Sequence, residues 1–316
     1  MDQTNRSVVV GESVVVKWLT PPAPLPQPAP DVFAHLTSVG FTATATPYAA
    51  ISRRRRGGDG DDDGLLLALV TAYLPGAEDG WKWCVDEAVS GGTGFAAGLG
   101  SLAADLHAAM ATPSTTFPDP VRHAPAHRGP GPAPWAARAA DAVDEALALT
   151  GGPDGEWLSA HAAELRAELT APAPAEATTL IRIHGDLHVG QILRWRGGYA
   201  VIDFDGNPTV TGAGPFQPAA RDLAQLTTSL EHVGQVAIKR RGAAPARIGT
   251  WAAAARAALE TGYLARLSEL GHGALLDRSL IRPFEIEQEC RELVYAARHL
   301  PRWRYAPMGV LRSWYP

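Results

Sequence analysis

The chain has 316 residues, of which 46% are hydrophobic and 19% charged, and its formal net charge is −5. This composition is typical of a globular protein with a sizeable core and excludes a disordered chain. The negative charge argues against a nucleic-acid partner, and no apolar run is long enough to predict a membrane span. Its two cysteines, Cys84 and Cys290, form no disulfide framework and no metal-binding spacing, and the N-terminus MDQTNRS is too polar for a signal peptide, so we expect a cytoplasmic protein.

The first eighty residues predict a small strand-rich lobe with one helix. Valine-rich residues 7–19 form a hairpin around Gly11-Glu12, and the proline-rich residues after them predict an extended connector. A short helix follows, and then two strands joined by RRRRGGDGDDDG, a loop that is either a phosphate-binding segment or a solvated hairpin tip. The connector, the helix and the two strands are expected at 20–30, 31–39, 48–52 and 65–74.

From about Trp81 the apolar residues recur at helical spacing, interrupted only by two short β-type runs on either side of position 190. The predicted helices are 95–110, 135–149, 156–169, 219–230, 248–270 and 283–299. The sequence therefore predicts an α+β protein of two lobes, as in protein kinases. Residues 1–80 form a β-rich nucleotide-binding lobe, and 81–316 form a mainly helical lobe for catalysis and acceptor binding.

The segment IRIHGDLHVGQILRWRGGYAVIDFDGNP carries the clearest chemical pattern. Phosphoryl transfer from a nucleotide needs an acid that holds the acceptor hydroxyl and oxygen ligands that hold Mg²⁺ on the phosphates. Asp186 is the predicted base, Gln191 and Asp203 are the predicted metal ligands, and Asp205 is expected to assist. The alternative is that these are ordinary acids in turns, but an acid, a spaced amide, a strand and a second acid coincide here.

Several other polar residues near this pattern have simpler interpretations. His184 and His188 flank Asp186 with a spacing that also fits a zinc site. We favour a structural role, with one ring packed under the loop and the other bonded to backbone. Asp222 is expected to cap a helix or anchor the catalytic loop, and His107 is expected to be a core residue.

Lys17 ends the second strand of the hairpin, where a lysine can neutralise the α- and β-phosphates of a nucleotide. A surface lysine at a strand end is commonplace, so this prediction depends on the catalytic segment downstream. The expected helix at 31–39 holds no glutamate to pair with it. We also expect Ser7, in TNRS, to contact phosphate. Val70 and Ala72 are expected where an adenine would meet backbone donors and acceptors, and the alternative for their side chains is a place in the core.

The last predicted helix, PFEIEQECRELVYAARH, places acidic and amide side chains on one face. Carboxylates that share a face repel each other unless a cationic or multiply hydroxylated group lies opposite, although a solvated acidic face is the alternative. Sugar sites often combine carboxylates, an amide and an aromatic wall, and Trp303 follows closely. The residues of this face are Glu285, Gln288, Glu289 and Glu292.

HGDLHVGQIL and VIDFDGNP resemble the catalytic core of the aminoglycoside-phosphotransferase-like kinases, and DQTNRSVVVGESVVVKWL resembles the phosphate loop and lysine hairpin of their maltokinase branch. IEQECRELVYAARHLPRW is more similar to the maltokinase-like glucosamine kinases. The resemblance runs from Asp2 to about Trp303. Relatives of this branch usually carry a further N-terminal cap region, whereas this sequence starts at the hairpin.

The resemblance implies a monomeric sugar kinase that uses ATP and Mg²⁺, with glucosamine as the acceptor and its 6-hydroxyl as the site of transfer. It also implies sugar contacts from Asp186, Gln288, Glu289, Glu292 and Trp303. An acidic site favours an ammonium-bearing acceptor, because a carboxylate forms a charge-assisted hydrogen bond with it. The alternatives are a maltokinase, an aminoglycoside phosphotransferase and a nucleotide-binding regulatory protein without transfer activity.

Overall fold

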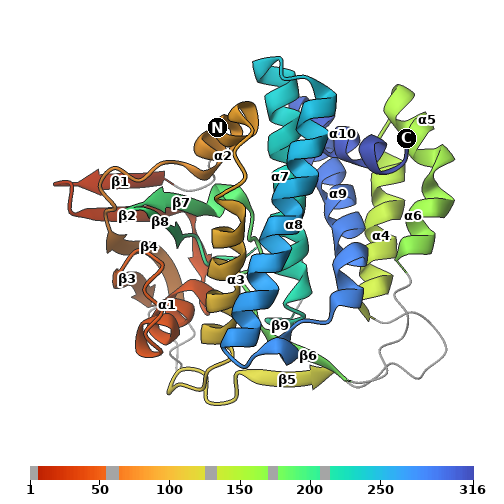
Figure 1. Ribbon diagram of the computed structural model, residues 1–316. Coiled ribbons are helices and arrows are strands. Elements are labelled where there is room, and N and C mark those ends of the chain that lie inside the picture. Colours follow the sequence, from red (N-terminus) through yellow and green to blue (C-terminus); the bar gives the residue numbers. More distant parts are fainter. Residues whose placement is uncertain (1–5, 55–63, 125–133, 170–176, 207–213) are drawn as a thin grey trace.

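The structure, a computed structural model, describes residues 6–54, 64–124, 134–169, 177–206 and 214–316. A four-stranded antiparallel sheet with one helix lies on one side, and the long helices pack together on the other (Figure 1). Strand order in this sheet is β1-β2-β4-β3. The predicted α+β architecture of two unequal parts is therefore confirmed. Its elements are β1 (Arg6–Val10), β2 (Val14–Pro24), α1 (Pro28–Ser38), β3 (Pro47–Arg54) and β4 (Gly64–Ala72).

The predicted hairpin is present, but β2 runs further than expected, into the proline-rich segment. Its pairing with β4 shifts between Trp18 and Ala23, and Ala23 and Pro24 then pair with Leu66 and Leu65. The prolines at 21 and 22 lie in this irregularity, where a missing N–H costs no ladder hydrogen bond. The charged loop predicted between the next two strands falls largely on 55–63, outside the described residues.

The helical part matches the sequence pattern in most positions. The expected helix at 156–169 is two helices that meet at His161, and α7 extends eleven residues past its expected end at Leu230, to Arg241. Helix α10 and two strands, β5 (Val121–Ala124) and β9 (Phe216–Gln217), were not predicted, and α2 lies where a helical pattern was expected without predicted bounds. The helices are α2 (Gly80–Ser90), α3 (Ala96–Met110), α4 (Pro134–Leu149), α5 (Gly152–Ala160), α6 (Ala162–Glu168), α7 (Ala220–Arg241), α8 (Pro245–Glu269), α9 (Ile281–Arg298) and α10 (Tyr305–Trp314).

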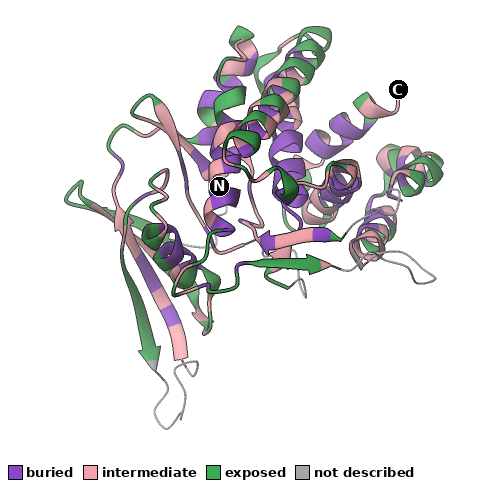
Figure 2. Ribbon diagram, turned by 60° about the horizontal axis from the view of Figure 1, so that its bottom comes forward, coloured by how far each residue is buried: buried purple, intermediate pink, exposed green. Residues whose placement is uncertain are grey.

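The main core lies where α3, α7 and α8 pack together, whereas every residue of β1 is exposed. Figure 2 shows many buried residues on the helices. Glycines allow α3 and α8 to approach closely. A Cβ on Gly100 would lie 2.0 Å from the Leu259 carbonyl oxygen, and one on Gly262 would lie 2.3 Å from that of Ala97. A smaller core forms among α4, α5, α6, α9 and α10. These two cores hold α7 and α9 side by side, and both helices reach the site described below.

The predicted catalytic segment lies between the sheet of the first lobe and the helices. Strand β6 (Thr178–Arg182) leads into the loop that carries Asp186, and the hairpin β7 (Ile192–Trp195) and β8 (Gly198–Val201) follows. Strand β6 pairs with β5 and with β9 (Phe216–Gln217). Isolated bridges join Thr44 to Val201 and Glu78 to Arg194, so the catalytic hairpin is connected to the first lobe. No helix among the described residues is long and apolar enough to cross a membrane.

Candidate active site

The loop before Asp186 is fixed by a buried carboxylate from α7. Asp222 accepts hydrogen bonds from the backbone N–H groups of His184 at 2.7 Å and Gly185 at 2.9 Å. Gly185 has a φ of +81°, which a residue with a side chain rarely adopts. The ring of His107, fully buried, contacts the same carboxylate at 3.2 Å. Of the two roles expected for Asp222, the structure supports the loop anchor, and His107 belongs to the core as predicted.

The Asp186 carboxylate is held by two amide side chains. Gln225 Nε2 donates to its Oδ1 at 2.7 Å, and Gln191 Nε2 donates to its Oδ2 at 3.3 Å. Burial alone would raise the pKa of Asp186, but the hydrogen bond and charge of His188, together with His184, outweigh it and hold the pKa below its usual value. The carboxylate is therefore ionised and oriented, as a group that positions a hydroxyl and accepts its proton must be.

The two histidines beside Asp186 make local hydrogen bonds. His184 is buried, with its Nε2 3.0 Å from the Ile202 carbonyl oxygen, and its Nδ1 accepts from the N–H of Asp186. The Nδ1 of His188 accepts from the N–H of Gly190. The part of the chain that the structure describes holds no group of three His, Cys, Asp or Glu residues suited to a metal ion. The structural interpretation of both histidines is thus preferred to the zinc site.

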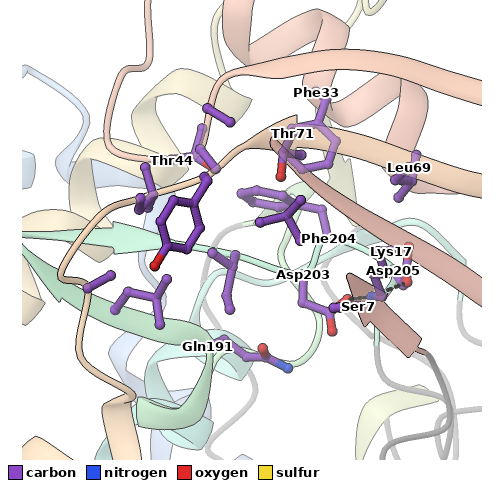
Figure 3. A pocket seen from close by; sticks show the side chains of 18 of the residues that line it. Ser7, Lys17, Phe33, Thr44, Leu69, Thr71, Gln191, Asp203, Phe204 and Asp205 are labelled. Carbon is purple, nitrogen blue, oxygen red and sulfur yellow. Dashed lines mark hydrogen bonds and ion pairs between the residues drawn. The ribbon is translucent and has the colours of Figure 1, made fainter. Parts of the chain in front are cut away.

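A cavity of about 540 Å³ opens between the first sheet and the β7–β8 hairpin, and charged side chains meet at one end of it (Figure 3). Lys17 Nζ lies 2.6 Å from Asp203 Oδ1 and 2.7 Å from Asp205 Oδ2. Burial lowers the pKa of Lys17, but the two carboxylates outweigh this effect and raise it. Lys17, for which the sequence offered no glutamate partner on α1, is therefore paired with the two acids of the D-F-D segment.

Oxygen donors at this end of the cavity suit a hard divalent cation. Mg²⁺ is usually bound by one or two carboxylates together with substrate phosphates, rather than by a cage made entirely of protein. Asp203, Asp205 and Gln191 line the cavity and supply two carboxylates and an amide oxygen. The donor set fits Mg²⁺, which would neutralise charge on the transferred phosphate.

Cross-strand register decides which residues of the first sheet reach this cavity. Ser7 pairs with Lys17, and Lys17 pairs with Leu69, so the three side chains share the face that lines it. Val70 pairs with Val16 on the opposite face, because successive side chains in a strand alternate. The side chain of Val70 therefore does not line the cavity, and Leu69 and Thr71 line it instead, whereas contact of adenine with the backbone at Val70 stays a prediction. Ser7 and Ala72 do line it, as expected.

A second cavity, of about 690 Å³, begins at Asp186 and runs between α7 and α9. Within it Glu292 accepts hydrogen bonds from Gln288 Nε2 at 3.0 Å and from Trp303 Nε1 at 2.7 Å. The Trp303 ring lies between Trp81 and His232, with centroid distances of 5.7 and 5.6 Å. The wall thus combines a carboxylate, an amide and an aromatic face, which is the combination expected for a sugar site.

Two members of the predicted acidic face do not reach this cavity. Glu285 is buried and pairs with Arg256 and Arg282, and Glu289 is fully buried. Oε2 of Glu289 lies 2.9 Å from His232 Nε2, while its Oε1 has no hydrogen-bond partner among the described residues. The structure does not bring Glu289 to the cavity, because α9 is covered by neighbouring helices on this side. The sequence analysis therefore assigned too many residues of α9 to the acidic face of the cavity.

Comparison with known proteins agrees with this geometry. The family model described as "Phosphotransferase enzyme family" matches residues 2–207. The glucosamine kinase of Streptacidiphilus jiangxiensis is 41% identical over 97% of this chain and 70% of its own, and that of Mycolicibacterium smegmatis is 36% identical over 98% and 77%. A solved glucosamine kinase in complex with glucosamine, ADP and inorganic phosphate has a TM-score of 0.83 and 37% identity, covering 99% of this chain and 80% of that chain.

The chain belongs to the phosphotransferase enzyme family. In this phosphotransferase, sequence reasoning missed the contribution of α7 to the acceptor cavity. Gln225, Thr228, Ser229 and His232 line the second cavity, although they lie about 40 residues beyond Asp186. The signal in the sequence was a row of polar side chains at helical spacing, which is unusual on a face that packs inward.

Proposed function

We infer that this phosphotransferase transfers the γ-phosphate of ATP to glucosamine. The observation that carries this conclusion is the meeting of two cavities at Asp186 and Gln191. One is lined by the lysine and acids suited to a nucleotide with Mg²⁺, and the other by groups suited to a sugar. Relatives named glucosamine kinase, at 36–41% identity along nearly the whole chain, support the same acceptor.

Each catalytic role follows from the position of a side chain. Asp186 orients the acceptor hydroxyl and accepts its proton late in the transfer, when the bond between the γ-phosphorus and the oxygen of the departing ADP is largely broken. Lys17 would pair with the nucleotide phosphates in place of its acidic partners, and Asp203, with Gln191 and Asp205, would hold Mg²⁺. The chain supplies orientation and charge, which are the main contributions of protein to this reaction.

The acceptor is held on its other side by α9 and the aromatic residues. Glu292 accepts hydrogen bonds from hydroxyl or ammonium groups, and Trp303 packs against the C–H face of the ring. A carboxylate gains more from an ammonium group than from a hydroxyl, so glucosamine is favoured over glucose and maltose. We place the transfer at the 6-hydroxyl, the primary and least hindered alcohol of the sugar.

A coupled ADP-release assay with Mg²⁺ and ATP tests this proposal across glucosamine, glucose, N-acetylglucosamine, maltose and kanamycin. We expect turnover on glucosamine, and none with Asp186→Ala, whose ATP binding remains. Glu292→Gln should raise the KM for glucosamine by about tenfold through loss of a charged hydrogen bond, with little change in the KM for ATP. Turnover on maltose or kanamycin in place of glucosamine would overturn the acceptor assignment. Phosphorus NMR of the product identifies the modified hydroxyl.

A further inference from the structure

The acceptor cavity is longer than one sugar ring. Six of its lining residues come from α7, at positions 225, 228, 229, 232, 236 and 240, which form one stripe along the helix. Fifteen residues of helix rise by about 22 Å, at 1.5 Å per residue. Asp186 is held at the Gln225 end of this stripe, so a single hexose placed there leaves the other end of the cavity vacant.

Charge changes sign along this cavity. The carboxylates of Asp186 and Glu292 line the cavity together with two exposed arginines, Arg240 at the far end of the α7 stripe from Gln225, and Arg302. Within the described ranges, no carboxylate forms an ion pair with either arginine. Arg291, which also lines the cavity, is paired with the buried Glu287 and contributes less free charge.

Helix stability alone does not explain this arrangement. Cations in the last turn of a helix complement its dipole, and Lys239, Arg240 and Arg241 all lie there on α7. Only Arg240 of these three lines the cavity, while Arg241 reaches Asp86. Arg302 comes from a separate short helix after α9 and reaches the same cavity. The positions of Arg240 and Arg302 are therefore explained better by a role in the cavity than by stabilisation of the end of α7.

We propose that Arg240 and Arg302 are specificity determinants that restrict the acceptor to a single amino-sugar ring by repelling the further ammonium groups of polycationic aminoglycosides. This inference rests on the proposed function of the same site. One ring with one ammonium group fits the acidic inner end. A larger acceptor with the same kind of ring must extend along the stripe, where its remaining ammonium groups approach guanidinium groups that pair with no carboxylate in the part of the chain that the structure describes. Discrimination of this kind uses repulsion against the wrong ligand as well as attraction for the right one.

Arg240→Glu and Arg302→Glu test this proposal in the full-length protein, with Lys239→Glu as the matched control. Lys239 is exposed on the same helical turn and does not line the cavity, so its variant makes the same change in charge. Dissociation constants for kanamycin and for glucosamine are measured by titration calorimetry. We expect each arginine variant to bind kanamycin about five- to tenfold more tightly at about 0.01 M salt, and less so at about 1 M, where screening shortens the range of charge.

The dissociation constant for glucosamine, which carries one ammonium group, should change by about twofold or less in the same variants. Arg240→Gln should change the logarithm of the dissociation constant for kanamycin by about half as much as Arg240→Glu does. It replaces Arg240→Glu in the test if the reversal of charge disturbs folding. An equal change for kanamycin in Lys239→Glu, or none in either arginine variant, would overturn the proposal. Turnover of glucosamine by the wild-type protein tests the proposed function separately, because these dissociation constants require no turnover.

Discussion

The side-chain amide of Gln225 donates a hydrogen bond to Oδ1 of Asp186 at 2.7 Å, across 39 positions of sequence. The same helix anchors the loop that carries Asp186, through Asp222. It then continues as one wall of the acceptor cavity. Helix α7 therefore couples the orientation of the proposed base to the shape of the site that receives the sugar.

Replacement of Gln225 should change catalysis more than nucleotide binding. Gln225→Leu removes a hydrogen bond to a charged group, worth about 1.5–3 kcal/mol, so kcat should fall about 10- to 100-fold. Gln225→Glu should also shift the acidic limb of the pH–rate profile upward, because a like charge raises the pKa of Asp186. Steady-state kinetics across pH provide the measurement. A rise in the KM for glucosamine with kcat unchanged would mean that Gln225 only binds the acceptor.

Lys17→Met should separate nucleotide binding from binding of the metal alone. The variant loses a cation for the phosphates, so we expect the KM for ATP to rise about tenfold while that for glucosamine changes little. Asp203 and Asp205 lose their shared partner, and their mutual repulsion favours a divalent cation. Mg²⁺ without nucleotide should therefore raise the melting temperature more in the variant than in the wild type. A smaller rise would show that Lys17 does not compete with the metal.

Asp222→Ala should destabilise the fold. The change leaves the buried N–H of His184, the N–H of Gly185 and the ring of His107 without their acceptor. Each such loss costs about 1–3 kcal/mol, so the free energy of unfolding should fall by about 3 kcal/mol or more. Urea unfolding followed by circular dichroism measures it. Asp141→Ala, at an exposed position on α4, is the control and should change stability by about 0.5 kcal/mol or less.

Glu289→Gln should change how stability depends on pH. Burial raises the pKa of Glu289 well above its usual value, and neighbouring carboxylates add to the effect. The folded state therefore keeps a proton that the unfolded chain releases near pH 4.3, so wild-type stability falls as pH rises above about 4.3. Glutamine at this position does not titrate. The titratable and charged groups facing Glu289 are His232 and Glu231 from α7, Arg256 from α8, and Glu285 and Glu292 from α9.

We expect the melting temperature of Glu289→Gln, relative to that of the wild type, to increase between about pH 5 and pH 8. The neighbouring groups are common to both proteins, so the difference isolates position 289. Scanning calorimetry at several pH values measures it. A difference that is constant with pH would indicate that Glu289 is ionised in both folded and unfolded states.

The order of the elements was predictable because the pattern of each is local. Period-2 valines around Gly11-Glu12 predict the first hairpin, and apolar residues at helical spacing predict α3, α4, α8 and α9. The residues at which the elements end were harder to predict. Helix α7 continues beyond Leu230 because neighbouring elements bury polar side chains there, such as that of His232. The helix then ends at Gly242, which has a left-handed backbone conformation. Those contacts involve residues distant in sequence.

For the site, the sequence alone determined Asp186, Gln191 and Asp203 as candidates, since loop chemistry and strand spacing keep such a segment recognisable. Only the tertiary structure decided which of the neighbouring side chains reach a cavity. Register turned Val70 away from the nucleotide cavity, and helix packing buried Glu289 while leaving Glu292 beside Trp303. The reason is physical: a repeat in sequence fixes the face of an element on which a side chain lies, but the surroundings of that face depend on distant segments that only folding brings together.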